Sequence, residues 1–406
     1  MGPGAAVADI RNAVRACLAD LEPGDVVLVA CSGGADSLAL AAALAFVGPK
    51  LGLRCGGVTV DHGLQEGSAE RAAAVVAALQ RLQLDPVYSV AVEVADARAG
   101  GPEAAARAAR YRALDEIADR AAPAAPPAPA RRAAPSASTA PRRAAPGAHQ
   151  TEAVILLGHT LDDQAETVLL GLARGAGARS LAGMPERRGN YRRPLLNIRR
   201  AQTIRACEEL GLQTWQDPHN ADSRYARVRV RRDALPALEA ALGPGVTEAL
   251  ARTARQLRAD ADCLDDLAFA ESEHIRGNAS DPAGIDVRYL ADLPEAIRTR
   301  ILHQAAVMAG SPPGALTARH VQQAAELVTC WHGQRWADLP GGIRVRRRDG
   351  KLWFTGGANT TSGASATSGP GATSGPGTTS GPGTTSEATV TGEGNGEGNK
   401  EDSGSE

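Results

Sequence analysis

The chain carries, near its N-terminus, the stretch VVLVACSGGADS at residues 26–37. Its first five residues are apolar, which predicts a buried strand, and the apolar run at 38–47 predicts a helix. A glycine turn between a strand and a helix presents backbone N–H groups to a phosphate, at the positive end of the helix dipole. The two glycines let the backbone approach the ligand without a Cβ in the way, and the two serines add hydroxyl donors.

Asp36 is the unusual residue of this turn, because a carboxylate beside a phosphate repels it unless a cation lies between them. Mg²⁺ is the natural cation, since it is hard and prefers oxygen ligands. No lysine follows the turn as in a Walker A loop, and the spacing differs from G-x-G-x-x-G. One interpretation without chemistry is a glycine-rich turn with a capping serine or aspartate. The residues SGGADS at 32–37 instead resemble the pyrophosphate loop, SGGxDS, of ATPases that cleave ATP between the α- and β-phosphates.

The composition excludes several classes of protein. The formal net charge of the 406 residues is −2, which argues against a uniformly basic coat for nucleic acid. Residues 179–232 depart from this average, with 13 Arg and no Lys against 5 acidic residues, a local charge of +8 that suits a polyanionic partner. The six scattered cysteines form no C-x-x-C pair, so we expect reduced thiols in a cytoplasmic protein. No apolar run approaches the length that spans a membrane.

Strand-like and helix-like runs alternate through the first half of the chain. Strands are predicted at 26–30, 55–61, 86–94 and 154–158, and helices from 37, near 68–82, at 102–121 and at 161–174. This alternation predicts an α/β fold with a parallel sheet and right-handed crossovers. Ligands of such sheets lie beyond the carboxyl ends of the strands, where the loop at 32–37, Asp61 and His159 all fall.

The rest of the chain divides into further segments. Residues 122–150 are mostly Ala, Pro, Ser and Arg and are predicted to be a disordered insertion within a first domain over 1–232. Apolar residues at helical spacing predict a helical domain over 233–310, and Asp349-Gly350 between strand-like runs predicts a hairpin in a small unit over 311–357. The acidic Gly/Ser/Thr/Pro-rich tail at 358–406 is predicted to be disordered. The expected architecture is a parallel-sheet nucleotide-binding domain, a small mainly helical domain and a disordered tail.

Three further stretches, together with the loop, point to one family. They are EAAARAARY at 103–111, HTLDDQAET at 159–167, and RPLL at 193–196 followed by DPHNADSRYARVR at 217–229. Together they resemble tRNA(Ile)-lysidine synthetase, a member of the pyrophosphate-loop ATPases, over roughly residues 25–238. The Asp-Pro-x-Asn-x-Asp block that leads to the arginines is the most discriminating stretch.

The resemblance implies a two-step ligation that uses ATP and Mg²⁺. ATP adenylates the C2 oxygen of the wobble cytidine, C34, of a tRNA(Ile) that carries the CAU anticodon. The ε-amine of free L-lysine then displaces AMP and leaves lysidine, which changes codon reading from AUG to AUA. Oxide is a poor leaving group and AMP a good one, so the activation is needed. Members of the family are often dimers, so a homodimer is one assembly that the resemblance allows.

His159, Asp163 and Glu166 are the candidate catalytic residues that follow the strand at 154–158. They are four and three residues apart, so on a helix they would share one face. A histidine and carboxylates that converge at a strand end suit contact with cytosine, metal binding or removal of a proton from lysine. The alternative is a helix start whose acids complement the dipole, which explains Asp162 and Asp163 but explains His159 and Glu166 poorly.

Several arginines are candidates for contact with the tRNA. Arg107 and Arg110 share a helix face, although Glu103 and Arg107 also match a simple i,i+4 ion pair. Arg227, Arg229 and Arg231 alternate with valine, so as a strand they would share one face. As a helix start they would not, and the proline at 236 fits that interpretation poorly; the sequence leaves both open.

The resemblance carries site roles onto matching positions of this chain. Asp61 lies at a strand end near the expected adenosine, and a capping aspartate is the alternative there. The nucleotide set is Ser32, Gly33, Gly34, Asp36, Ser37 and Asp61, with Asp36 on Mg²⁺; the catalytic set is Asp36, His159, Asp163 and Glu166; the tRNA set is Arg107, Arg110, Tyr111, Arg193, Asn220, Asp222, Tyr225, Arg227 and Arg229.

Two other functions compete with ligation. A tRNA thiolase of the same ATPase class needs a cysteine pair or an iron–sulfur cluster, and the chain has no C-x-x-C. A nucleotide-sensing RNA-binding module could keep the loop, but pure binding does not need Asp36 or the acids at 162–166. Both alternatives are therefore weaker than the ligase hypothesis.

Overall fold

A computed structural model describes most of the chain up to residue 356. The described residues are 3–61, 63, 67–92, 101–122, 153–175, 177–215, 222–278 and 284–356. The predicted disordered insertion, apart from Ala122, and the predicted acidic tail lie outside them, as does Asn220. Among the helices described, none is long and apolar enough to cross a membrane.

The N-terminal body is built on a six-stranded sheet in the order β3-β2-β1-β4-β6-β5. All neighbouring pairs are parallel except β5 with β6. The strands are β1 (Val26–Ala30), β2 (Arg54–Asp61), β3 (Val87–Ala91), β4 (Val154–Leu157), β5 (Arg187–Arg188) and β6 (Tyr191–Arg192). The predicted parallel α/β fold is confirmed, and β3 is shorter at both ends than the predicted strand at 86–94.

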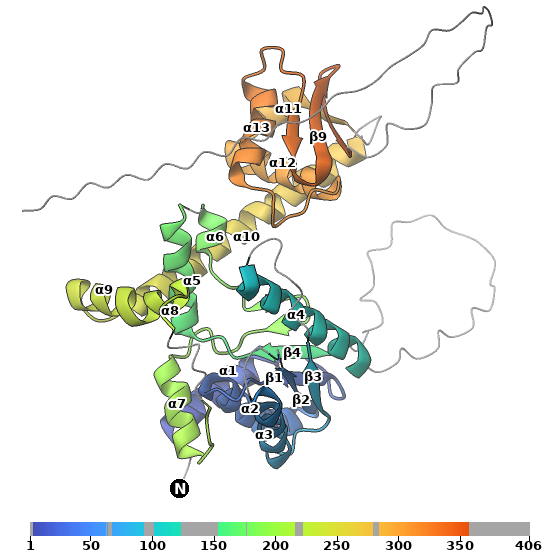
Figure 1. Ribbon diagram of the computed structural model, residues 1–406. Helices are drawn as coiled ribbons and strands as arrows, with labels where there is room; N and C mark the ends of the chain where they lie inside the picture. The colour runs from blue at the N-terminus through green and yellow to red at the C-terminus, as the bar shows by residue number, and fades with distance from the viewer. Residues whose placement is uncertain are drawn as a thin grey trace, which may run out of the picture. The chain divides into compact units, whose positions relative to one another are not determined.

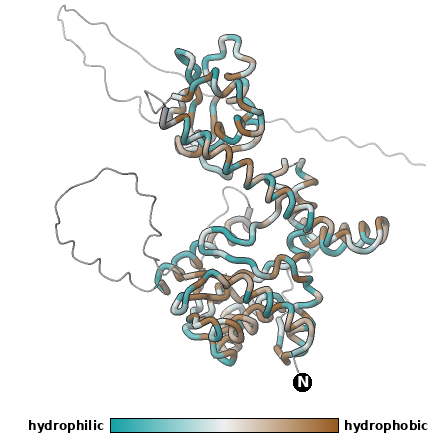
Figure 2. Tube along the Cα trace, turned by 180° about the vertical axis from the view of Figure 1, so that it is seen from behind, coloured by the Kyte–Doolittle hydropathy of each residue, from teal (hydrophilic) through white to brown (hydrophobic). Residues whose placement is uncertain are grey.

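The central strand β1 is buried on both faces of the sheet. Val27 and Val29 pack into one hydrophobic core with α1, α2 and α3, whereas Val26 and Leu28 pack into a second core with α4. This split follows from the period of two along a strand. Figure 1 shows α4 and the α1–α3 group on opposite faces of the strands, and hydrophobic stretches gather in this body in Figure 2. The helices here are α1 (Ala5–Cys17), α2 (Ala35–Val47), α3 (Ser68–Arg81), α4 (Gly101–Ala121), α5 (Leu161–Ala173), α6 (Ala178–Leu181) and α7 (Arg200–Glu209).

The arginine-rich segment after residue 222 is helical. It forms α8 (Ala226–Arg229), a π-helical turn (Val230–Ala234) and α9 (Leu235–Leu242). The objection from Pro236 was wrong, because Pro236 lies in the first turn of α9, directly after a π-helical turn, and helical backbone continues through this point. Arg227, Arg229 and Arg231 therefore do not form a strand with one shared face.

The C-terminal body combines helices with an antiparallel sheet in the order β7-β10-β9-β8. Its hydrophobic core joins Ala268 of α10 to Leu290, Ile301, Val345 and Leu352. The predicted hairpin is present, and a short strand within the segment predicted as helical adds to its sheet. The domain boundaries at 232, 310 and 357 stay predictions. The elements are α10 (Val246–Asn278), β7 (Gly284–Asp286), α11 (Val287–Asp292), α12 (Glu295–Met308), α13 (Ala318–Thr329), β8 (Ala337–Leu339), β9 (Ile343–Arg348) and β10 (Lys351–Gly356).

Leu44 tests the core that supports the loop at 32–37. Its side chain lies in α2 and is fully buried. We expect Leu44→Ala to lower the free energy of unfolding by about 2–5 kcal/mol, because the substitution leaves a cavity under that helix. Urea unfolding followed by circular dichroism measures the change. Leu172→Ala, at a position that is 51% exposed, is the matched control and should change it by less than about 0.5 kcal/mol.

Candidate active site

The loop between β1 and α2 is braced by the hydroxyl of Ser37. This hydroxyl donates to the Gly34 carbonyl at 2.9 Å and accepts from the Ser32 backbone N–H at 3.2 Å. Ser37 is buried, whereas the side chain of Ser32 is exposed. Ser37 therefore holds the loop in shape, and Ser32 is the more exposed serine, with its hydroxyl 3.4 Å from that of Ser37.

The two glycines of the loop are needed for different reasons. Gly33 has φ +85°, and a Cβ there would lie 2.9 Å from Val75 Cγ2, so the fold itself requires glycine. Gly34 has room for a Cβ within the protein, with no heavy atom closer than 3.8 Å. Its lack of a side chain is explained by a ligand that approaches the backbone, as a phosphate does at a helix N-terminus.

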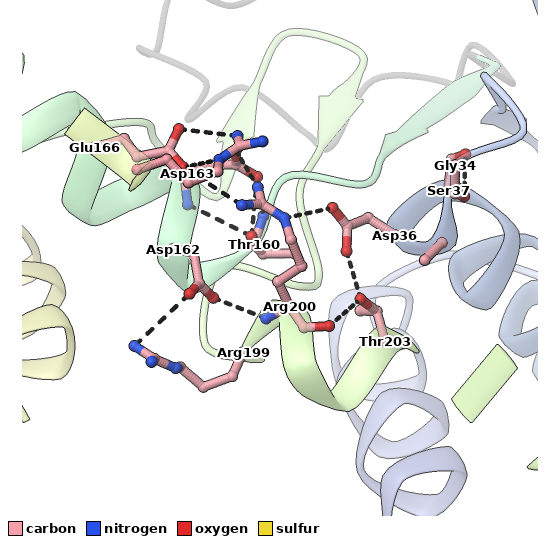
Figure 3. A network of polar contacts seen from close by, with 12 residues as sticks. Gly34, Asp36, Ser37, Thr160, Asp162, Asp163, Glu166, Arg199, Arg200 and Thr203 are labelled. Atoms are coloured by element: carbon pink, nitrogen blue, oxygen red, sulfur yellow. Dashed lines mark hydrogen bonds and ion pairs between the residues drawn. The ribbon is translucent and has the colours of Figure 1, made fainter. Parts of the chain in front are cut away.

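Arg200 lies at the centre of the site and contacts three carboxylates from two other elements. Its Nε lies 3.2 Å from Asp36 Oδ2, its Nη2 lies 2.8 Å from Asp163 Oδ1, and its Nη1 lies 3.4 Å from Glu166 Oε1. Figure 3 shows this guanidinium between Asp36 on one side and the α5 acids on the other. The start of α2 and the start of α5 are thereby joined by one side chain of α7.

Glu166 is a fully buried carboxylate that is paired with arginines. Arg231 Nε lies 2.6 Å from its Oε1, and Arg227 Nε lies 3.2 Å from its Oε2. A carboxylate without solvent stays charged only when it is paired and hydrogen-bonded. Arg227 also donates to Thr167 at 2.9 Å, so the helix that carries it is fixed to α5.

Asp163 has one oxygen in a helix cap and one in the site. Its Oδ2 accepts from the Thr160 backbone N–H at 2.8 Å, in a capping box that starts α5. Its Oδ1 faces Arg200. Although burial opposes ionisation, Arg200 and the Thr160 N–H hold the pKa of Asp163 below its usual value. One oxygen of Asp163 therefore serves the helix cap, and the other contacts Arg200.

His159 precedes the helix and does not lie on it, so the predicted shared helix face with Asp163 and Glu166 was wrong. The helix begins at Leu161 after the cap at Thr160. Burial lowers the pKa of His159 to about 4, and nearby arginines add to this. Its Nδ1 is buried and has no hydrogen-bond partner among the residues that the structure describes. A neutral imidazole with an unused polar atom suits contact with a nucleobase and is a poor base for an ammonium group.

Arg107, Tyr111 and Arg193 lie on the His159 side of the site. Arg107 Nη2 donates to the Tyr111 hydroxyl at 3.3 Å, and both Arg107 and Arg193 are close enough to His159 to lower its pKa. Arg193 is buried and donates to the Pro185 carbonyl at 3.0 Å. Arg110, the other predicted arginine of this helix, is exposed.

The remaining predicted residues make local contacts. Asp61 accepts from the Gly63 N–H at 2.9 Å and from the Ser68 hydroxyl at 3.2 Å, as a capping residue does. Asp222 pairs with Arg224 at 2.7 Å, and Arg229 Nη1 donates to the carbonyls of the same turn. Tyr225 caps α8. Arg229 therefore braces its own turn, unlike Arg227, which reaches Glu166.

The oxygen donors at Asp36 fit a magnesium ion that is shared with phosphates. In the described part of the chain no group of three or more His, Cys, Asp or Glu is arranged to hold a metal by itself. Mg²⁺ is commonly bound by one or two carboxylates together with substrate phosphates and water. Asp36 and Asp163 both contact Arg200. Burial raises the pKa of Asp36, and the charge of Asp163 adds to this. The chain thus offers part of a coordination shell, and a nucleotide would have to supply the rest.

Arg200 and Thr203 were missed as site residues by the sequence reasoning, and Arg231 was weighed there only as part of a stripe. Thr203 donates a hydrogen bond to Asp36 Oδ1, and Arg231 pairs with Glu166. One signal was available: Arg199-Arg200 begins a helix, where positive charge opposes the dipole. A basic pair at that position requires acidic partners from elsewhere in the fold.

Comparison with known proteins identifies the family of this chain. The fold and site define a PP-loop ATP-binding domain, and a family model described as the PP-loop domain matches residues 8–123 and 145–238. A model described as the TilS substrate binding domain matches residues 286–353. The chain belongs to the tRNA(Ile)-lysidine synthase family and, like other PP-loop ATPases, uses ATP.

Relatives of similar length support this assignment. The tRNA(Ile)-lysidine synthase of Thermobifida fusca is 54% identical over 352 residues, covering 86% of this chain and 98% of the relative. That of Streptomyces coelicolor is 49% identical over 381 residues, covering 87% and 99%. The structure of the U34-tRNA thiolase NcsA from Methanococcus maripaludis, with its [4Fe-4S] cluster, aligns at 17% identity and TM-score 0.47, covering 62% of this chain and 79% of that one. The synthase relatives do not favour the thiolase alternative.

We expect His159 to remain neutral well below its usual pKa. An unfolded histidine gains a proton below pH 6.5, whereas the folded one does so near pH 4, so stability is lost as the pH falls between these values. His159→Gln should reduce that loss by about 1–3 kcal/mol. Urea unfolding at pH 8 and at pH 4.5 measures the difference. An NMR titration of the His159 ring with a midpoint near 6.5 would contradict this prediction.

Proposed function

We propose that this protein ligates L-lysine to C2 of the wobble cytidine of CAU-anticodon tRNA(Ile). In the first step the C2 oxygen attacks the α-phosphorus of ATP, and the bond to the β-phosphate oxygen breaks, so pyrophosphate leaves. In the second step the ε-amine of lysine attacks C2, the C2–oxygen bond breaks, AMP leaves and the nitrogen loses a proton. The reaction consumes one ATP for each lysine joined.

One observation carries the proposal. The guanidinium of Arg200 contacts Asp36 at the pyrophosphate loop and also the acids of α5, so the two lie side by side. A site that adenylates a base must hold the phosphate and the base side by side, because proximity supplies much of the rate. The loop at 32–37 would hold the pyrophosphate. The unpartnered Nδ1 of His159, with Arg107 and Arg193 nearby, supports a role for these residues in holding the cytosine.

Asp36 would hold Mg²⁺ together with the phosphates of ATP. The ion would neutralise the charge that develops on the leaving pyrophosphate. Asp163 and Glu166 carry negative charge in the same cluster, which suits the ammonium group of lysine before it loses its proton. In our proposal Asp163 orients this ammonium group, because one of its oxygens is committed to the helix cap and the other faces the site.

The same proposal covers the partners of the enzyme. The segment at 179–232, with its charge of +8, is complementary to the negative charge of a tRNA. Tyr225, Arg227 and Asn220 are the residues proposed to contact the tRNA near its anticodon. We place the protein in the cytoplasm, where its tRNA substrate is found, and a homodimer remains part of the hypothesis.

Asp36→Asn tests the chemistry of the first step. We expect AMP formation with tRNA(Ile) to fall by at least about a hundredfold, because a neutral amide is a much weaker ligand for Mg²⁺. Chromatography of labelled nucleotide products measures it. Asp119→Asn, at an exposed position of α4, is the matched control and should keep wild-type activity. If Asp36→Asn still releases AMP at the wild-type rate, Asp36 is not the ligand of Mg²⁺.

Incorporation of labelled lysine tests the substrate. We expect lysine to enter CAU-anticodon tRNA(Ile) and to be absent from tRNA(Met), which shares the anticodon, when ATP is supplied. Acid-precipitated counts measure the product. The absence of incorporation, or equal incorporation into both tRNAs, would contradict the proposed function.

A further inference from the structure

Asp36 is held at both oxygens by the first turn of α7. Arg200 Nε lies 3.2 Å from Oδ2, and the Thr203 hydroxyl donates to Oδ1. Figure 3 shows the carboxylate between these two side chains. The residue proposed to bind Mg²⁺ therefore already has a positive charge beside it in the protein without nucleotide.

The contacts of Arg200 are unequal in a way that matters for this carboxylate. Its Nη2 contact to Asp163 is 2.8 Å long, whereas its Nε contact to Asp36 is 3.2 Å and its Nη1 contact to Glu166 is 3.4 Å long. The Nη2 and Nη1 atoms are committed to the acids of α5. The guanidinium can give up Asp36 and remain paired with Asp163 and Glu166.

A cation at Asp36 and the guanidinium at Asp36 compete through charge. A divalent cation and a guanidinium that share one carboxylate repel each other, and this repulsion is stronger in a partly buried site than in water. The Asp36 side chain is 23% exposed and that of Arg200 is 22% exposed, so solvent screens this repulsion only in part. Mg²⁺ alone should therefore bind weakly at Asp36.

We propose that Arg200 is a positioning residue that pairs with Asp36 when no metal is bound. It leaves this carboxylate only when Mg²⁺ binds together with a nucleotide. A guanidinium released from Asp36 is suited to a phosphate oxygen, so the nucleotide offers Arg200 a new partner as the metal takes the old one. The consequence is that metal and nucleotide bind together. This inference rests on the proposed place of Mg²⁺ at Asp36.

The test is Mn²⁺ binding to the protein without nucleotide, followed by electron paramagnetic resonance of the free ion. We expect wild-type protein to bind Mn²⁺ weakly and Arg200→Gln, which removes the charge and keeps a hydrogen-bonding side chain, to bind it at least tenfold more tightly. Arg200→Lys keeps the charge and should remain near the wild-type affinity. An affinity in Arg200→Gln that is within twofold of wild type, or weaker, overturns the proposal.

Two further variants separate the proposal from a general loss of structure. Arg199→Gln removes the neighbouring charge, which lies near Asp162 and Glu248, and should leave the Mn²⁺ affinity within twofold of wild type. Thr203→Val removes the other donor to Asp36 without a change of charge and should raise the affinity about two- to threefold. If Arg200→Gln does not fold, Arg200→Met, which also removes the charge, takes its place, and a Mn²⁺ affinity within twofold of wild type, or weaker, overturns the proposal.

The failure of the inference can be told apart from the failure of the proposed function. If Asp36→Asn abolishes AMP formation while Arg200→Gln leaves Mn²⁺ binding unchanged, the proposed function stands and Arg200 does not compete with the metal for Asp36. If the Mn²⁺ affinity of Arg200→Gln does not fall when Asp36→Asn is added, the metal binds elsewhere. A tenfold gain that the double variant loses supports both.

Discussion

The pairing of buried carboxylates with arginines is the constraint on which this site depends. Glu166 has no exposed side-chain surface and contacts Arg200, Arg227 and Arg231. Removal of one partner from such a cluster leaves an uncompensated charge, which costs far more than a surface ion pair gives. The start of α5, the start of α7 and the turn after α8 must therefore come together for any of them to be stable. The charges that serve the chemistry also fix the geometry of the elements that carry them.

The parallel sheet explains why these charges meet at one place. The carboxyl ends of β1 and β4 are adjacent because the two strands pair directly. A Cβ on Gly158, just after β4, would lie 3.2 Å from the backbone of Asp36, so the end of β4 packs against the first turn of α2 as closely as glycine allows. The loop that is proposed to bind phosphate and the helix that carries Asp163 and Glu166 then start from neighbouring points. Arg200 reaches both because α7 packs against α2 within the same hydrophobic core.

Much of this could be predicted from local patterns. The strand–glycine–helix sequence at 26–47, the alternation of strands and helices, and the hairpin at Asp349-Gly350 are encoded by residues close together in the chain. The place of His159 outside the helix was predicted wrongly, because spacing alone does not reveal that Thr160 caps α5. The helical state of 226–234 was left open because alternation of Arg and Val fits a strand locally. It is decided by contacts of Arg227 and Arg231 with Glu166, more than 60 residues earlier.

The sequence by itself determined the class of fold, the loop at 32–37 and the identity of most charged groups at the site. These follow from short-range rules: side-chain periodicity, glycine conformation and the residue types that suit phosphate and metal. Only the tertiary structure decided which charge pairs with which. Asp36, Asp163 and Arg200 are separated by up to 164 residues, and their contacts exist because the sheet and the core place three helix starts together. Coulomb interactions in a buried site depend on distances of a few ångströms, which no local pattern in a chain specifies.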